Sequence, residues 1–258
     1  MRGTVYWRVL GGFLVAGNLF SQGVAAPIPI NNWFAISSIP EAVLVGGDTA
    51  SPKYQEIGRR GFGQFFSYFD PVTLADGQKL TVNFGLTLDI DAPDLRFAEF
   101  RMGLFKSSDL RADADSDAHR ITRDESVVEG WSGFLLILPN RPGALKPTMI
   151  YRRKLEDGTN YTTKSGLDLR SAFSQPGPQP VFRNGEEKMF SLVLEREGNN
   201  LLATLLYDEG SFSGLLAGAF GDGYEARFDS LGLYATESDA VINSLSVNNA
   251  LLTHNSGE

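Results

Sequence analysis

Four aspartates in one charged stretch have the side-chain type that a hard metal ion prefers. Asp113, Asp115 and Asp117 stand at alternate positions, and Asp124 follows shortly after them. Ca²⁺ takes about six to eight oxygen ligands, which such carboxylates can supply. The run has Ala118 where a calcium loop of the EF-hand type has glycine for its sharp turn. A Ca²⁺ site and a solvated acidic loop are therefore the two interpretations of this stretch.

A second set of side chains is polar or aromatic and lies on segments that alternate like β-strands. It consists of Asn83, Glu99, Arg101, Tyr151 and Arg153. If Phe100 faces the core, Glu99 and Arg101 share the opposite face of their strand. On a concave face, arginine and tyrosine would hydrogen-bond to a sugar or stack on it, and the guanidinium suits uronic acid carboxylates. The alternative is ion pairing on a solvated face.

Aromatic residues in expected turns offer a third kind of sugar contact. They are Trp131, Tyr161, Phe212 and Tyr224. An exposed ring can stack on the apolar face of a sugar. Trp131 directly precedes an apolar strand, however, so packing in the core is the simpler expectation for it.

Catalytic residues are scarce. The chain has no cysteine and two histidines, His119 and His254, which argues against a Ser-His-Asp triad, thiolate chemistry and a multi-histidine metal site. Carboxylates such as Glu195 do not form a pair marked by spacing for glycoside hydrolysis. A polysaccharide lyase would need a base, a neutralising group and an acid, for which Tyr151, Arg101 and His119 are candidates. We expect a non-catalytic protein and keep catalysis as an alternative.

The net charge limits the classes of binding partner, and the amino-terminal segment indicates the cellular compartment. A formal net charge of −8 argues against binding nucleic acid or anionic lipid. Arg2 and Arg8 precede an apolar stretch over residues 9–20 that is too short to span a bilayer, and small residues precede Pro27. Residues 1–26 therefore read as a cleavable signal peptide. We expect a mature, soluble domain over residues 27–258, secreted or periplasmic, and its lack of cysteine favours a bacterial source.

Strand-like patterns position these candidates. Apolar and polar residues alternate over 80–89, which indicates a half-buried strand. Two further runs, 189–196 and 201–207, flank a short Gly-Asn linker and predict a hairpin. Residues 133–138 are continuously apolar, as in a strand covered on both sides. Only a short turn is expected at 214–218. About ten such segments predict an all-β, two-sheet antiparallel sandwich in one domain.

The closing segments carry a resemblance. Residues 227–234, RFDSLGLY, followed by 242–247, INSLSV, resemble the last strands of concanavalin A-like (laminin-G-like) jelly rolls of secreted bacterial proteins. The resemblance covers most of residues 33–249 as a pattern and implies a jelly roll with one concave face, which in that family often holds sugar. The chain lacks the Glu-x-Asp-x-x-Glu strand of the hydrolases.

The resemblance therefore implies a secreted, non-catalytic carbohydrate-binding or surface-associated protein with a polysaccharide or glycan as partner. Fold alone does not choose among its members. The alternatives are a polysaccharide lyase or glycoside hydrolase acting on an extracellular polysaccharide, and a structural or adhesive exoprotein.

Overall fold

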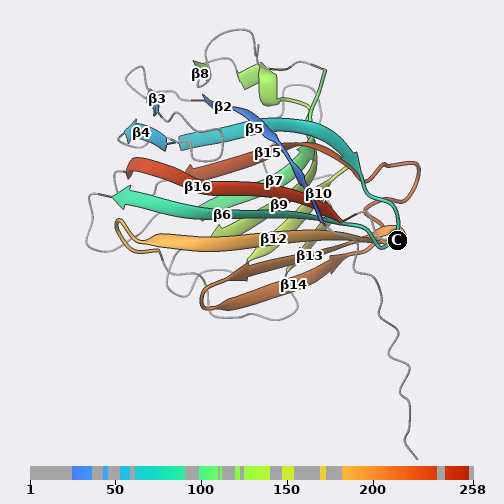
Figure 1. Ribbon diagram of the computed structural model, residues 1–258. Helices are drawn as coiled ribbons and strands as arrows, with labels where there is room; N and C mark the ends of the chain where they lie inside the picture. The colour runs from blue at the N-terminus through green and yellow to red at the C-terminus, as the bar shows by residue number, and fades with distance from the viewer. Residues whose placement is uncertain are drawn as a thin grey trace, which may run out of the picture.

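The computed structural model describes residues 25–36, 43–45, 53–58, 62–90, 99–109, 111, 120–122, 125–139, 147–153, 169–172, 182–236 and 242–255. Within them the chain forms two stacked β-sheets and a single turn of 3₁₀ helix, η1 (Glu125–Val128) (Figure 1). This confirms the predicted all-β, two-sheet jelly-roll sandwich.

Sheet A contains eight of the described strands. In spatial order they are β14 (Gly210–Leu216), β13 (Asn200–Tyr207), β12 (Glu187–Glu197), β6 (Lys79–Ile90), β16 (Ile242–Asn255), β4 (Lys53–Gly58) and β3 (Val43–Val45), with β1 (Ala26–Ile28) paired to β16. All of these pairings are antiparallel.

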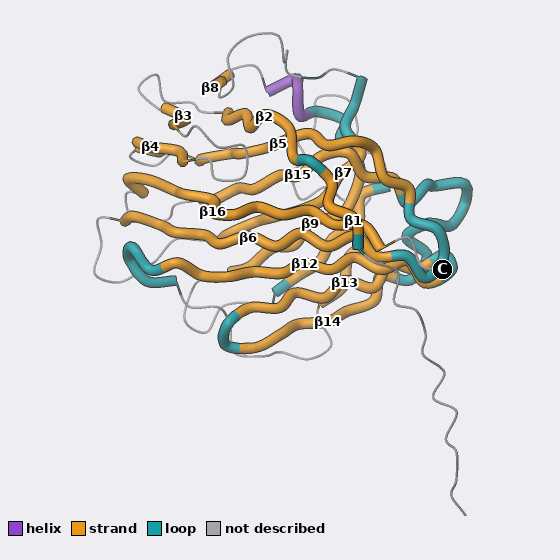
Figure 2. The backbone as a smooth tube through the Cα atoms, viewed as in Figure 1, coloured by secondary structure: helices purple, strands orange, loops and turns teal. Residues whose placement is uncertain are grey.

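Sheet B also contains eight described strands. Their order is β11 (Leu169–Ala172), β10 (Thr148–Arg152), β9 (Ser132–Pro139), β7 (Glu99–Lys106), β15 (Arg227–Thr236), β5 (Phe62–Thr73), β2 (Ile30–Ile36) and β8 (Arg120–Thr122). The pairing of β2 with β8 is parallel and the others are antiparallel. The chain crosses between sheets as it passes from β5 to β6 to β7, and again from β15 to β16, which is the jelly-roll connection (Figure 2).

Alternation along the strands builds the core between the sheets. The apolar residues at the even positions 80–88 of β6 are buried, while Thr81, Asn83 and Thr87 point outward and are half-buried. On β7, Phe100, Met102 and Leu104 are fully buried and face the same interior. The predicted period-two pattern is therefore confirmed on both strands, and it assigns each side chain to a face.

A second apolar cluster covers the outer face of sheet B. It contains Phe34, Phe66, Tyr68, Phe105, Val128, Trp131, Leu135, Ile137 and Ile150. Strand β9 consequently has apolar neighbours on both faces, as its continuous apolar run predicts. Trp131 is fully buried and donates its indole N–H to the carbonyl oxygen of Val127 at 3.1 Å. This confirms that Trp131 packs inside the protein.

The β12–β13 hairpin forms as predicted, with Gly198 in the left-handed region at φ 60°. The segment that follows differs from expectation. Where the sequence predicted only a short turn over 214–218, strand β14 continues to Leu216 and the turn spans 217–220. Phe212 and Leu216 of β14 are buried, and their packing against the core stabilises the strand. Its glycine residues have low strand propensity, which is why the sequence pattern does not predict the full strand.

Candidate functional site

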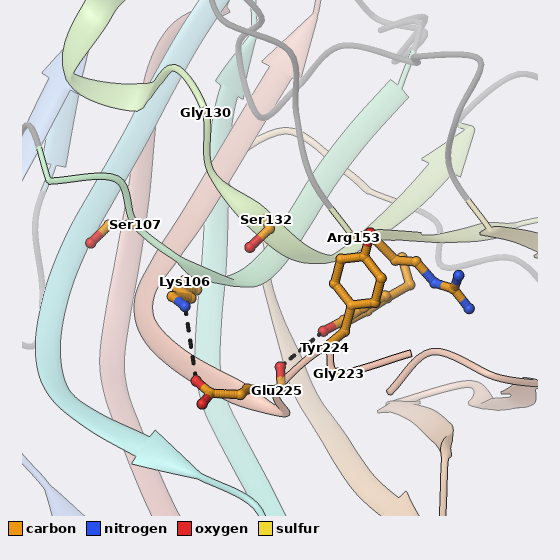
Figure 3. Close-up of a pocket in the computed structure, with 9 residues that line it drawn as sticks. Lys106, Ser107, Gly130, Ser132, Arg153, Gly223, Tyr224 and Glu225 are labelled. Atoms are coloured by element: carbon orange, nitrogen blue, oxygen red, sulfur yellow. Dashed lines mark hydrogen bonds and ion pairs between the residues drawn. The ribbon is translucent and has the colours of Figure 1, made fainter. Parts of the chain in front are cut away.

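A pocket of about 460 Å³ lies at one end of sheet B, where four neighbouring strands begin or end (Figure 3). Strands β7 and β10 end there, while β9 and β15 begin there, because all three pairings among them are antiparallel. The lining residues are Lys106, Ser107, Gly130, Ser132, Tyr151, Arg153, Gly223, Tyr224 and Glu225. The pocket thus combines two tyrosine rings, two serine hydroxyl groups and charges of both signs.

The loop over residues 217–226 supplies one wall of the pocket and is anchored at several points. Phe220 is buried, and its N–H donates to the carbonyl oxygen of Asn199 at 2.9 Å. Asn200 accepts the N–H of Gly218 through its side-chain oxygen at 3.0 Å. Asp222 and Gly223 both have positive φ, at 58° and 85°. Gly adopts this left-handed conformation without strain, and Asp adopts it more readily than most residues. The two consecutive left-handed residues turn the loop sharply just before Tyr224.

Arg153 connects the end of β10 to this loop. Its Nη2 donates to the carbonyl oxygen of Gly218, and its Nη1 lies 3.6 Å from the carboxylate of Asp222. The guanidinium also sits 5.1 Å from the centre of the Tyr224 ring, within the range of a cation–π contact. The side chain of Arg153 is therefore committed to holding the loop and orienting the ring, rather than extending alone into the pocket.

Tyr224 gives the pocket an accessible aromatic surface. The residue is 38% exposed, although tyrosine is large and apolar enough to be mostly covered in proteins. Its backbone N–H donates to the carbonyl oxygen of Gly221 at 3.2 Å, so the ring projects from a hydrogen-bonded turn. An exposed ring held in place from the protein side can offer its remaining surface to a ligand.

Tyr151 lies at the base of the pocket and belongs to the core. Its ring meets that of Phe220 edge to face at 5.3 Å, and its hydroxyl donates to the carbonyl oxygen of Glu225 at 3.5 Å. Burial raises the pKa of Tyr151 well above its usual range, although the nearby Arg153 charge opposes this. The hydroxyl stays protonated at neutral pH, so Tyr151 is not poised to act as a general base.

The charges at the mouth balance one another. Lys106 Nζ lies 3.9 Å from the carboxylate of Glu225, and both side chains are well exposed. Such a pair contributes little to stability, so both groups remain available to a ligand. Because Asp222 opposes Arg153 in the same way, the pocket combines polar groups without a strong excess of either charge.

Behind the pocket, a buried carboxylate fixes the segment that follows β7. Asp229 accepts the backbone N–H of Ser107 at 2.7 Å, a side-chain N–H of Arg111 at 2.9 Å and the hydroxyl of Ser230 at 2.8 Å. Arg111 in turn stacks on the ring of Tyr68. Since Ser107 lines the pocket, this network sets the position of its rim.

The structure brings together two of the five ligand-binding residues predicted from the sequence. Tyr151 and Arg153 both line the pocket. Glu99 and Arg101 lie on β7 of sheet B, and Arg101 points to the outer face, where it stacks on Tyr234 at 4.9 Å. Asn83 lies on the outer face of sheet A. The five residues therefore do not share one surface.

The predicted calcium ligands Asp113, Asp115, Asp117 and Asp124 lie outside the described residues. Among the residues that the structure does describe, no three His, Asp or Glu side chains are grouped as a metal site would require. The same part of the chain contains no helix that is long and apolar enough to cross a membrane.

The sequence marks Tyr224 as a turn aromatic but gives no link between it and Arg153, and it does not single out Lys106, Ser132 or Glu225. These residues come from distant parts of the chain, and sheet pairing alone brings them to one sheet end. The glycine-rich run before Tyr224, GAFGDGYE over 218–225, is the signal that could have marked this loop.

No family model matches the chain, and no curated protein matches it. Solved structures of lectins and lectin-like domains do match. The potassium-bound carbohydrate recognition domain of Emp46p is 10% identical with a TM-score of 0.47, covering 88% of this chain and 89% of that one. The seed lectin of Lotus tetragonolobus is 8% identical with a TM-score of 0.47, covering 90% and 98%.

The lectin UEA-II complexed with galactose is 10% identical with a TM-score of 0.44, covering 91% of this chain and all of that one. At these identities and TM-scores the similarity is one of general shape. The assignment of this chain to a two-sheet sandwich follows from the pairing of its own strands.

Proposed function

We propose that this chain is a non-catalytic carbohydrate-binding protein that holds a glycan in the pocket around Tyr224. The observation that carries the proposal is the exposed Tyr224 ring, fixed by Arg153 and surrounded by hydroxyl and charged groups in a pocket of about 460 Å³. This volume lies within the range of small-molecule sites, about 300–1,000 Å³. A ring for the apolar face of a sugar and polar groups for its hydroxyls are complementary to a saccharide.

The charge balance favours a neutral sugar over a uronic acid. Arg153 is already engaged by a carbonyl, a carboxylate and an aromatic ring, and Lys106 faces Glu225. A uronate carboxylate would have to compete with Asp222 or Glu225 for these cations. A neutral sugar can instead hydrogen-bond to Lys106 and Glu225 together, because one donates and the other accepts.

Calorimetric titration with panels of neutral and uronate oligosaccharides tests this proposal. We expect binding to a neutral sugar, a loss of about tenfold or more in Tyr224→Ala, and retention of most affinity in Tyr224→Phe, which keeps the ring. Met189→Ala is the matched control, because Met189 is an exposed apolar residue on sheet A. Absence of binding across both panels, or equal binding by Tyr224→Ala, would reject the site.

We further propose that the protein is exported and that residues 1–26 are removed during export. We also propose that the protein comes from a bacterium. The cationic start, the short apolar stretch and the small residues before Pro27 support export. Among the described residues, Pro27 and Ile28 of β1 pair with the end of β16, so a mature chain that begins at Pro27 would keep this pairing. Amino-terminal sequencing of exported protein should give Pro27 or a neighbouring residue as the first. An intact start at Met1 would contradict this.

A further inference from the structure

On the outward side of sheet A, the described strands present regular rows of side chains. Strand register across β14, β13, β12, β6 and β16 defines three rows. The first is Ser211, Leu206, Ser191, Asn83 and Leu251; the second is Ser213, Thr204, Val193, Thr81 and Thr253; the third is Leu215, Leu202, Glu195, Lys79 and Asn255. We call these fifteen residues the row face; its strands lie side by side across the near sheet in Figure 2.

The row face exposes apolar side chains and carries almost no charge. Leu206, Leu215 and Leu251 are 44–46% exposed. Its two charged residues, Lys79 and Glu195, form an ion pair with each other at 2.9 Å. In a chain with a net charge of −8, an outward sheet face of hydroxyl, amide and leucine side chains is unusual. Depletion of charge around exposed apolar residues is characteristic of the centre of a protein interface.

We propose that the row face is the contact between two copies of this chain. A two-fold axis parallel to the strands, passing between β12 and β6, superimposes four of the five strands on one another, while β14 falls over β1, which pairs with the end of β16. This operation places β13 over β16 of the second copy and β12 over its β6. In the first row, Leu206 then meets Leu251 of the second copy. Sheets that pack face to face keep their strand directions within about 30° of each other. Each row of one copy can therefore face the same row of the second copy close to the axis.

The same axis makes the charges complementary. In the third row, Glu195 of one copy lies over Lys79 of the other, and the reverse pair forms on the opposite side of the axis. The second row brings Thr204 over Thr253, where hydroxyl groups can exchange hydrogen bonds. A self-complementary surface of this kind is what a two-fold interface requires.

The dimensions of the row face suit a dimer of modest affinity. Five strands about 4.8 Å apart span about 24 Å, and three rows along the strands span about 20 Å. This amounts to roughly 500 Å² from each copy, or about 1,000 Å² together, which is the lower bound for a specific interface. The strong negative charge of each chain favours contact through this neutral face over contact elsewhere.

Charge-reversed variants test the proposal by sedimentation velocity on the purified protein. Wild type should form a dimer whose population rises with concentration up to about 100 µM. Lys79→Glu and Glu195→Lys should each dissociate about tenfold more readily, because each places like charges across the axis. When the two variants are mixed, every cross-axis pair again joins opposite charges. We therefore expect a heterodimer, detected by isotope-labelling one chain for native mass spectrometry.

Leu206→Glu should also abolish the dimer, while Asn199→Glu, which adds the same charge in an exposed turn of the same sheet, should leave it unchanged. The heterodimer separates an interface role from the ion pair within one chain, since mixing cannot repair a defect inside a single copy. A wild type that stays monomeric at about 100 µM overturns the proposal. It is equally overturned if the two charge variants dimerise like wild type or fail to combine.

Discussion

The guanidinium of Arg153 lies 5.1 Å from the centre of the Tyr224 ring, so the residue that follows β10 holds the exposed aromatic surface of the pocket in position. Arg153 also binds the carbonyl oxygen of Gly218, which ties the same loop to the end of β10. Two residues separated by a long stretch of chain thus define one wall of the candidate glycan site.

Replacing Arg153 by lysine should lower glycan affinity about tenfold by releasing the Tyr224 ring. Lysine keeps the charge but loses the planar group that stacks and binds Gly218 at the same time. Calorimetric titration measures the effect, and a double-mutant cycle assigns its cause. Because Arg153 is a positioning residue, Arg153→Lys should add little to the loss in a Tyr224→Ala background. Fully additive losses would show that Arg153 contacts the ligand independently.

Asp229→Asn should destabilise the fold by about 1–2 kcal/mol, since a hydrogen bond to a charged group contributes roughly that much. The variant keeps the shape but removes the negative charge that faces Arg111 and Ser107. Arg111 is well exposed and can be rehydrated, which limits the cost. Urea unfolding measures the change in free energy. Asp222→Asn is the matched control, because that carboxylate is 84% exposed and its loss should cost less than about 0.5 kcal/mol.

The sequence predicts the strands of this fold better than it predicts the site. Alternation over β6 and β7 assigns Leu80 and Met102 to the interior because large apolar residues recur there at every second position. Strand β10, TMIYR, is apolar on both faces, so alternation does not show which of its side chains face the core. Tyr151 therefore read as an outward residue, although its ring packs in the core against Phe220.

The second apolar cluster explains another part of the difference. On β7, the alternation that places Phe100, Met102 and Leu104 in the main core directs Phe105 to the outer face, where it joins Phe66 in the second apolar cluster. Their burial depends on Trp131 and η1, which approach from elsewhere in the chain. Convergence of this kind depends on strand order rather than on local pattern, which is why the pocket residues could not be grouped in advance.

His254 should make the stability of the fold depend on pH below about 6.5. It lies on β16 opposite Ala26, with Nε2 at 3.3 Å from Oε1 of Gln78, and burial lowers its pKa from 6.5. Because the unfolded chain then binds more protons than the folded chain, stability falls as the pH drops from 6.5 toward the lower, folded-state pKa. Above 6.5 the imidazole is neutral in both states and this contribution vanishes.

Urea unfolding of wild type and His254→Gln between about pH 7.5 and pH 5 isolates this effect, because carboxylates titrate alike in both proteins. We expect the two free-energy curves to run parallel above pH 6.5 and to diverge below it, with wild type losing more stability. Glutamine can still hydrogen-bond to Gln78 but does not titrate, so the edge where β1 joins β16 should stay intact in the variant. Curves that remain parallel down to pH 5 would mean that His254 is as free to protonate in the fold as in the unfolded chain.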